Sequence, residues 1–234
     1  MFARISIAWC LVALSLPFVA RAQTETTNAP AETAESATQQ NDRMEEVPPE
    51  FEGMEVDEHL NNQIPPDLVF FNQNGERVKL GDYFDGKRPV ILTLNYYRCP
   101  MLCGLTLNGM VDGLKGVDWT MGDQYRILTV SFDPFEQPPL ALAKRENYVN
   151  YYERPVAEKG WDFLTGSPPG IKKLLDATGF PTRYDDRQKQ WIHPACLIVL
   201  TPDGHISRYL YGVQFAPQMM RLSLVEASEG KIGT

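Results

Sequence analysis

Residues 89–110 read Pro89-Val-Ile-Leu-Thr-Leu-Asn-Tyr-Tyr-Arg-Cys99-Pro-Met-Leu-Cys103-Gly-Leu-Thr-Leu-Asn-Gly-Met110 and hold the strongest structural signal in the chain. Val90 to Tyr97 is a short apolar run rich in β-branched and aromatic side chains, which predicts a buried central strand. Apolar residues then recur at roughly helical spacing, which predicts a helix directly after the strand; they are Leu102, Leu105, Leu107 and Met110.

Two cysteines lie at this predicted junction of strand and helix. Proline is tolerated at the first helical position, so Pro100 would place Cys99 at the helix cap and Cys103 one turn later on the same face. A thiol at a helix N-terminus lies beside unpaired N–H groups and the positive end of the macrodipole, which favours its thiolate. Such a pair can bind a soft metal ion or close into a disulfide. The alternative is two buried structural cysteines.

The composition is that of one soluble domain of ordinary size with terminal tails. Of the 234 residues, 43% are hydrophobic and 22% are charged, which is enough apolar material for a sizeable core. The formal net charge is −8, and the sequence contains no basic stripe. There is therefore no electrostatic case for binding nucleic acid.

Residues 1–22 predict a secretory signal peptide. The apolar run from Ile5 to Ala20 follows Arg4 and ends in Ala20-Arg21-Ala22, a small-residue pattern typical of cleavage before Gln23. The alternative is an uncleaved anchor, because the run is only slightly shorter than a membrane span. Either interpretation predicts an exported protein, periplasmic or anchored to the inner membrane on its periplasmic side.

Removal of the signal would leave three cysteines, Cys99, Cys103 and Cys196. An odd number in an exported protein cannot form a complete disulfide framework and suggests thiols kept for chemistry. Cys196 begins an apolar run and is predicted to be a buried core thiol.

Residues 23–62 are predicted to be a disordered tether, and residues 63–234 the folded domain. The tether is rich in Ala, Thr, Glu, Gln and Pro and offers few apolar side chains to bury. The rest of the pattern predicts an α/β domain with a mixed central sheet. Further strands are predicted at 68–71, 77–80, 125–132, 161–164, 196–201 and 206–211, and further helices at 139–152, 171–178 and 217–228.

His193 is a candidate third ligand. It precedes Pro194, which pushes its backbone toward extended geometry, and it comes just before the predicted strand at 196–201. By analogy with thioredoxin-like sheets, the loop that carries His193 would lie against the start of the cysteine helix. Two thiolates and an imidazole suit Cu(I) and can accept Cu(II). Zinc is the competitor, but structural zinc usually has four protein ligands; the other alternative is a packed or capping histidine.

These motifs together resemble the Sco/SenC family. The resemblance covers about residues 63–228 and is carried by three elements: Cys99-Pro-Met-Leu-Cys103 after an apolar strand, Val130-Ser-Phe-Asp133-Pro134 after the next strand, and His193 ahead of Leu197-Ile-Val-Leu-Thr-Pro-Asp-Gly204. The resemblance implies a thioredoxin-like fold, a mixed sheet flanked by helices with an N-terminal β-hairpin.

The resemblance also implies a function. It suggests a copper chaperone outside the cytoplasmic membrane that binds Cu(I), Cu(II) or both through Cys99, Cys103 and His193. Such a protein would metallate or reduce the binuclear copper site of cytochrome c oxidase, or serve another periplasmic copper protein, with a thiol reductant as a further partner. Asp133 would have a structural role or lie in the second shell of the metal site.

Three positions depart from the family pattern. Met101 stands where the family often has Asp, and Gly104 where Pro is common. Ile192 stands where an Asp often precedes the histidine, which removes a carboxylate partner for the imidazole.

A second hypothesis is a thiol–disulfide oxidoreductase that works without metal. Cys99 would attack a disulfide and Cys103 would resolve the mixed disulfide, so both would be catalytic. Such enzymes usually have two residues between the cysteines, whereas this chain has three, and the nearby histidine also favours a metal. A peroxidase of related fold is a weaker alternative, because no surrounding groups that would activate one cysteine toward peroxide are evident.

Overall fold

A computed structural model describes residues 52–156 and 160–233 of the chain. The predicted signal at residues 1–22 and most of the predicted tether lie outside these described residues.

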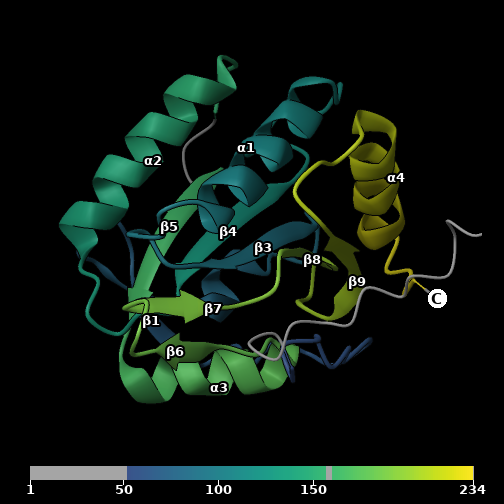
Figure 1. The fold of residues 1–234 in the computed structure, drawn as a ribbon. Coiled ribbons are helices and arrows are strands. Elements are labelled where there is room, and N and C mark those ends of the chain that lie inside the picture. Colours follow the sequence, from purple (N-terminus) through teal and green to yellow (C-terminus); the bar gives the residue numbers. More distant parts are fainter. Residues whose placement is uncertain (1–51, 157–159, 234) are drawn as a thin grey trace, which may run out of the picture. The chain divides into compact units, whose positions relative to one another are not determined.

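A seven-stranded mixed sheet lies at the centre of the domain (Figure 1). Its order is β2-β1-β5-β4-β3-β8-β9, with bounds β1 Val69–Phe71, β2 Arg77–Lys79, β3 Val90–Asn95, β4 Arg126–Ser131, β5 Trp161–Gly166, β8 Cys196–Leu200 and β9 Ile206–Tyr211. Strands β3, β4 and β5 run parallel, and β8 is antiparallel to β3. Every residue of β3 and β4 is buried, as expected for parallel strands covered on both faces.

Helices cover both faces of this sheet. In the described part of the chain they are α1 Leu102–Lys115, α2 Pro138–Tyr152, α3 Pro168–Thr178 and α4 Pro217–Ser228. Helices α1, α2 and α4 pack on one face and α3 on the other (Figure 1). Successive residues of β3 point to opposite faces: Ile91 packs in the core under α1, whereas Leu92 packs in the core over α3.

The predicted fold class is confirmed. The sheet is mixed, β1 and β2 form the predicted N-terminal hairpin, and α4 has the predicted bounds. The structure adds two elements that were not predicted from the sequence, a short 3₁₀ helix, η2 Leu80–Tyr83, and a second hairpin. This hairpin is formed by β6 Arg183–Asp185 and β7 Gln190–Ile192, outside the main sheet, and it leads directly into His193.

The pairing of β3 with β8 brings two distant loops together. Thr93 of β3 pairs with Leu197 of β8 in antiparallel register. The chain that enters β8 therefore runs beside the chain that leaves β3. This is the physical reason why His193 lies near Cys99, a neighbourhood that was predicted from fold analogy alone.

The packed domain begins before residue 63, so the predicted tether extends too far. The backbone amides of Asp57 and Asn61 donate to the carbonyl oxygens of Gly179 and Ile206, at 3.0 and 2.9 Å. Two apolar side chains of this polar segment also pack against the core, Val56 and Leu60. Composition alone does not reveal them because they are isolated among charged and amide side chains.

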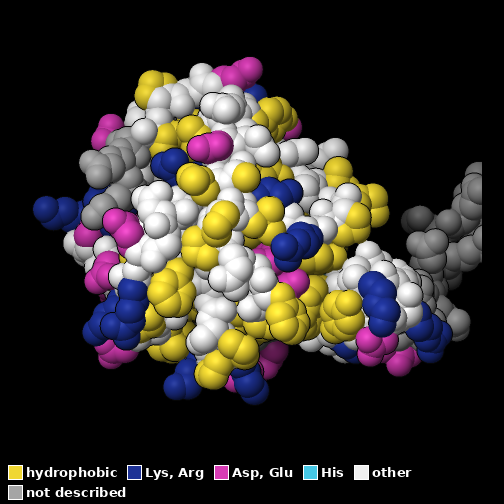
Figure 2. Space-filling model, turned by 90° about the vertical axis from the view of Figure 1, so that its left-hand side faces the viewer, with side chains coloured by type: hydrophobic (Ala, Val, Ile, Leu, Met, Phe, Trp, Pro, Cys, Tyr) yellow, Lys and Arg dark blue, Asp and Glu magenta, His cyan; other side chains and the backbone are white. Residues whose placement is uncertain are grey.

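The surface carries hydrophobic, basic and acidic side chains side by side. On the face drawn in Figure 2, hydrophobic side chains gather over the middle and lower part, and Lys and Arg are scattered with Asp and Glu among and around them. No continuous basic stripe forms on that face, in keeping with the net charge of −8. Within residues 52–156 and 160–233, no helix has both the length and the apolar character needed to cross a bilayer.

Candidate metal centre

The two cysteines flank the start of α1. Helix α1 begins at Leu102, so the prediction that Pro100 opens the helix and Cys99 caps its backbone is wrong by two residues. The reason is a separate turn before the helix, in which the amide of Cys99 donates to the carbonyl oxygen of Tyr96 at 3.1 Å.

Cys99 nevertheless caps the helix through its sulfur. The amide of Cys103, the second residue of α1, donates to Cys99 Sγ at 3.3 Å. The amide of Tyr96 in turn donates to Cys103 Sγ at 3.4 Å. Both sulfurs therefore accept from backbone N–H groups near the positive end of α1, an environment that favours negative charge on sulfur.

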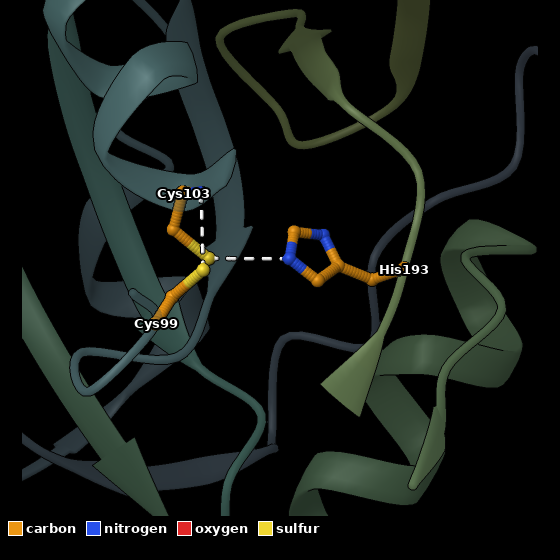
Figure 3. Close-up of side chains that lie close together, drawn as sticks. All are labelled: Cys99, Cys103 and His193. Carbon is orange, nitrogen blue, oxygen red and sulfur yellow. Dashed lines mark hydrogen bonds between the residues drawn. The ribbon is translucent and has the colours of Figure 1, made fainter. Parts of the chain in front are cut away.

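Cys99, Cys103 and His193 converge on one point (Figure 3). Their ligand atoms all lie within 4.8 Å of one another, and Cys103 Sγ is 3.3 Å from His193 Nε2. Cys103 and His193 are buried, with 4% and 6% of their surface exposed, whereas Cys99 is half-buried. The structure thus brings together all three residues singled out as ligands from the sequence.

The His193 ring is oriented by a backbone carbonyl. Its Nδ1 lies 2.9 Å from the carbonyl oxygen of Pro194. When Nδ1 carries the proton and donates it to this oxygen, the lone pair of Nε2 is left facing the sulfurs. The carboxylate that Ile192 fails to provide is therefore not required, because Pro194 supplies the outer hydrogen bond.

Aromatic rings surround the imidazole. The His193 ring centroid lies 5.3 Å from that of Phe132 and 5.9 Å from that of Tyr96, both edge-on, and 6.3 Å from that of Phe180 in a stacked arrangement. These rings cover the imidazole, which is why so little of His193 is exposed. The sequence places Tyr96 and Phe132 directly after two strands, but only the parallel pairing of those strands shows that the rings meet.

The two thiols differ in charge. A hydrogen bond from the Cys103 side chain, then one from His193 and others from the backbone, lower the pKa of Cys99 to about 3 despite its partial burial. Burial, followed by the hydrogen bond and the charge of Cys99, raises the pKa of Cys103. The reduced, metal-free pair therefore holds a thiolate on Cys99 and a proton on Cys103.

This difference predicts selective alkylation. At about pH 5.5, well below the ordinary thiol pKa of about 8.5, iodoacetamide should label the reduced, metal-free protein at Cys99 only. Cys103 and Cys196 should stay unlabelled, because they are 4% and 3% exposed and burial raises their pKa values. Peptide mapping by mass spectrometry measures the labelling; equal modification of the three cysteines would show that the assigned charges are wrong.

Asp133 forms its hydrogen bonds within the turn that follows β4. Its Oδ1 accepts a hydrogen bond from the amide of Phe135 at 2.9 Å, and its amide donates to Ser131 Oγ at 3.2 Å. Among the described residues, no hydrogen bond joins it to the cysteines or to His193. Of the two roles predicted for Asp133, the geometry supports the structural one.

Glu136, three residues further on, was not predicted from the sequence. This residue is 1% exposed, and its carboxylate accepts hydrogen bonds from the amides of Tyr97 and Arg98, which directly precede Cys99. A glutamate in a loop gives no sequence signal of burial.

Cys196 lies in the core as predicted, with its Sγ 3.3 Å from the carbonyl oxygen of Leu197.

Comparisons with known proteins show to which family the chain belongs. A model of the SCO1/SenC family matches residues 56–224. Among solved structures, a protein from Aquifex aeolicus is 24% identical with a TM-score of 0.64, over 74% of this chain and 95% of that one. Copper-bound ScoI from Arabidopsis thaliana is 17% identical with a TM-score of 0.56, over 71% and 99% of the two chains.

A third similar structure is BsSco, described as a member of the Sco family of cytochrome c oxidase assembly proteins with a disulfide switch. It is 24% identical with a TM-score of 0.56, over 74% of this chain and 96% of BsSco. None of the curated proteins matches the chain. The family match spans both cysteines, His193 and the whole central sheet, and it shows that this chain belongs to the SCO1/SenC family, with the thioredoxin-like fold of the Sco structures.

Proposed function

We propose that this protein binds copper through Cys99, Cys103 and His193 and takes part in assembling the copper site of cytochrome c oxidase. The observation that carries the proposal is the convergence of two sulfurs and one imidazole nitrogen within 4.8 Å, from loops about ninety residues apart in the sequence. Copper is then the cargo of the protein rather than a resident cofactor.

The donor set fits copper better than zinc. Two thiolate sulfurs and an imidazole match the preference of Cu(I) for soft ligands and can also hold Cu(II). A structural zinc site usually has four protein ligands, whereas the cluster in the described part of the chain has three. His193 Nε2 faces the sulfurs, and any proton on this nitrogen or on Cys103 must leave before all three atoms can bind the metal ion.

Transfer to a partner would begin at Cys99. It is the half-buried ligand, whereas Cys103 and His193 are buried, so an incoming ligand from a partner reaches Cys99 first. Two exposed apolar side chains lie on the loops that flank the site, Met101 (66% exposed) and Phe135 (79% exposed). A copper-receiving subunit of cytochrome c oxidase, or another periplasmic copper protein, would dock over these side chains.

The location outside the cytoplasmic membrane is part of the same proposal. It is supported by the signal-like pattern of residues 1–22 and by family membership. In an oxidising compartment the cysteine pair would need a thiol reductant before each round of copper loading.

Anaerobic titration of the reduced protein with Cu(I), against a chromophoric chelator, tests the binding step. The expected endpoint is about one copper ion per chain, as one three-ligand site of this kind requires. A parallel titration with Zn(II) should show weaker binding. A protein that takes up no copper, or holds zinc as tightly as Cu(I), would rule out the proposal.

A thiol–disulfide oxidoreductase is the second candidate, favoured by the unequal thiols. The Cys99 thiolate would attack one sulfur of a substrate disulfide and expel the other as a thiolate. Cys103 would then lose its proton and attack Cys99 Sγ, forming the Cys99–Cys103 disulfide and releasing a reduced substrate. A thiol reductant would have to return the pair to the dithiol. This reaction needs no metal ion, so a substitution of His193 separates the two functions.

A further inference from the structure

Glu136 is a buried carboxylate on the loop between β4 and α2. Its Oε1 accepts a hydrogen bond from the amide of Arg98 at 2.8 Å. Its Oε2 accepts from the amide of Tyr97 at 2.6 Å and from the hydroxyl of Ser131 at 2.6 Å. The side chain therefore binds the two consecutive backbone amides that directly precede Cys99.

Two of the three neighbours are backbone amides, which can only donate, so each oxygen of the Glu136 carboxyl group must accept from one of them. Burial is the largest effect on this group and leaves the pKa of Glu136 above its ordinary value, although the hydrogen bonds from Ser131, Tyr97 and Arg98 oppose it. A glutamine could not take its place, because an amide has one acceptor oxygen and its NH₂ group would face a backbone N–H. At least one of the two amides before Cys99 would then lose its partner.

The same loop also reaches the imidazole. Phe132, at its start, lies edge-on to the His193 ring at 5.3 Å and contacts Tyr96 at 5.7 Å. One loop therefore contacts both halves of the candidate metal centre, through Glu136 on the cysteine side and through Phe132 on the histidine side. Groups that orient metal ligands from outside influence affinity strongly, although they never touch the metal.

We propose that Glu136 is a positioning residue, which fixes the backbone of residues 97–98 and so sets where Cys99 Sγ lies relative to Cys103 and His193. The effect on copper rests on the copper-binding function proposed above. The effect on the backbone does not, because it is a property of the metal-free protein.

Three variants test the role of Glu136. Glu136→Gln keeps the shape but removes one acceptor, and Glu136→Asp keeps the charge but draws the carboxylate back from the amides. Asp162→Asn is the matched control: Asp162 is also a buried carboxylate, bonded to Gln73 and Tyr83, and pairs in register with Leu128, three residues before Ser131.

Two measurements are made on each variant. Hydrogen exchange of the Tyr97 and Arg98 amides in the reduced, metal-free protein should be faster in both Glu136 variants and unchanged in Asp162→Asn. Cu(I) affinity, measured by chelator competition, should fall about 10–100-fold in both Glu136 variants, as is typical for loss of an outer partner of a ligand. Thermal unfolding reports the general loss of stability in all three.

The outcomes separate this inference from the proposed function. Wild-type copper affinity in either folded Glu136 variant overturns the positioning role, and so does an equal loss of affinity in Asp162→Asn. If Glu136→Gln does not fold, Glu136→Asp decides in its place. Failure of the wild-type protein to bind copper defeats the proposed function instead, and the amide exchange then decides alone whether Glu136 fixes the loop.

Discussion

Cys103→Ser is expected to abolish Cu(I) binding by the reduced protein. Serine replaces a soft sulfur ligand with a hydroxyl, which Cu(I) does not favour. The loss of affinity should exceed the about 10–100-fold that removal of an outer partner costs. Chelator competition under anaerobic conditions measures it. Cys99→Ser should behave in the same way, because both sulfurs belong to the one cluster.

Cys196→Ser provides the matched control. Cys196 is as deeply buried as Cys103, at 3% against 4% exposed, but it lies outside the ligand cluster. Each substitution replaces a buried sulfur with a smaller hydroxyl that costs more to remove from water, so both should lower the free energy of unfolding, by about 1–3 kcal/mol. Cys196→Ser should still bind copper as the wild type does. Equal copper loss in the two variants would mean that damage to the core, rather than loss of a ligand, is responsible.

His193→Ala is expected to separate copper binding from dithiol chemistry. The variant should lose Cu(II) binding and bind Cu(I) more weakly, because only two sulfurs remain. Turnover of a disulfide substrate should largely persist, since the Cys103 side chain, not His193, has the largest effect in lowering the pKa of Cys99. Optical titration with Cu(II) and a disulfide-reduction assay measure the two activities.

His205→Ala is the control for this variant. His205 lies on a turn of the β8–β9 hairpin and pairs with Asp203 at 3.1 Å, outside the cluster. It should leave both activities unchanged. Full Cu(II) binding by His193→Ala would show that the imidazole is not a copper ligand. Loss of disulfide turnover in the same variant would show that the redox reaction also depends on His193.

The sequence predicts the sheet well because its central strands are buried on both faces. Such strands appear as continuous apolar runs, as in Val90 to Tyr97, and the turn after β8 has its glycine at Gly204, where φ is +86°. The short β6–β7 hairpin escaped prediction because its six residues are half-buried or exposed and follow no clear alternation.

The site could be predicted only in part. Cys99 and Cys103 stand out because they are close in sequence and lie at a strand–helix junction. Their link to His193 depends on the β3–β8 register, which local patterns do not contain. The hydrogen bond between His193 and the carbonyl of Pro194 cannot be predicted from side-chain types, because it involves a backbone group. The role of Glu136 cannot be predicted either, because it depends on backbone amides that only the fold brings to it.

X-ray absorption at the copper edge of the reduced, Cu(I)-loaded wild-type protein reports the ligands themselves. The structure predicts two sulfur scatterers and one imidazole nitrogen for each copper ion, the donor set of Cys99, Cys103 and His193. A spectrum with sulfur alone and no imidazole scattering, or one unchanged by His193→Ala, would show that copper is not bound where these three side chains meet.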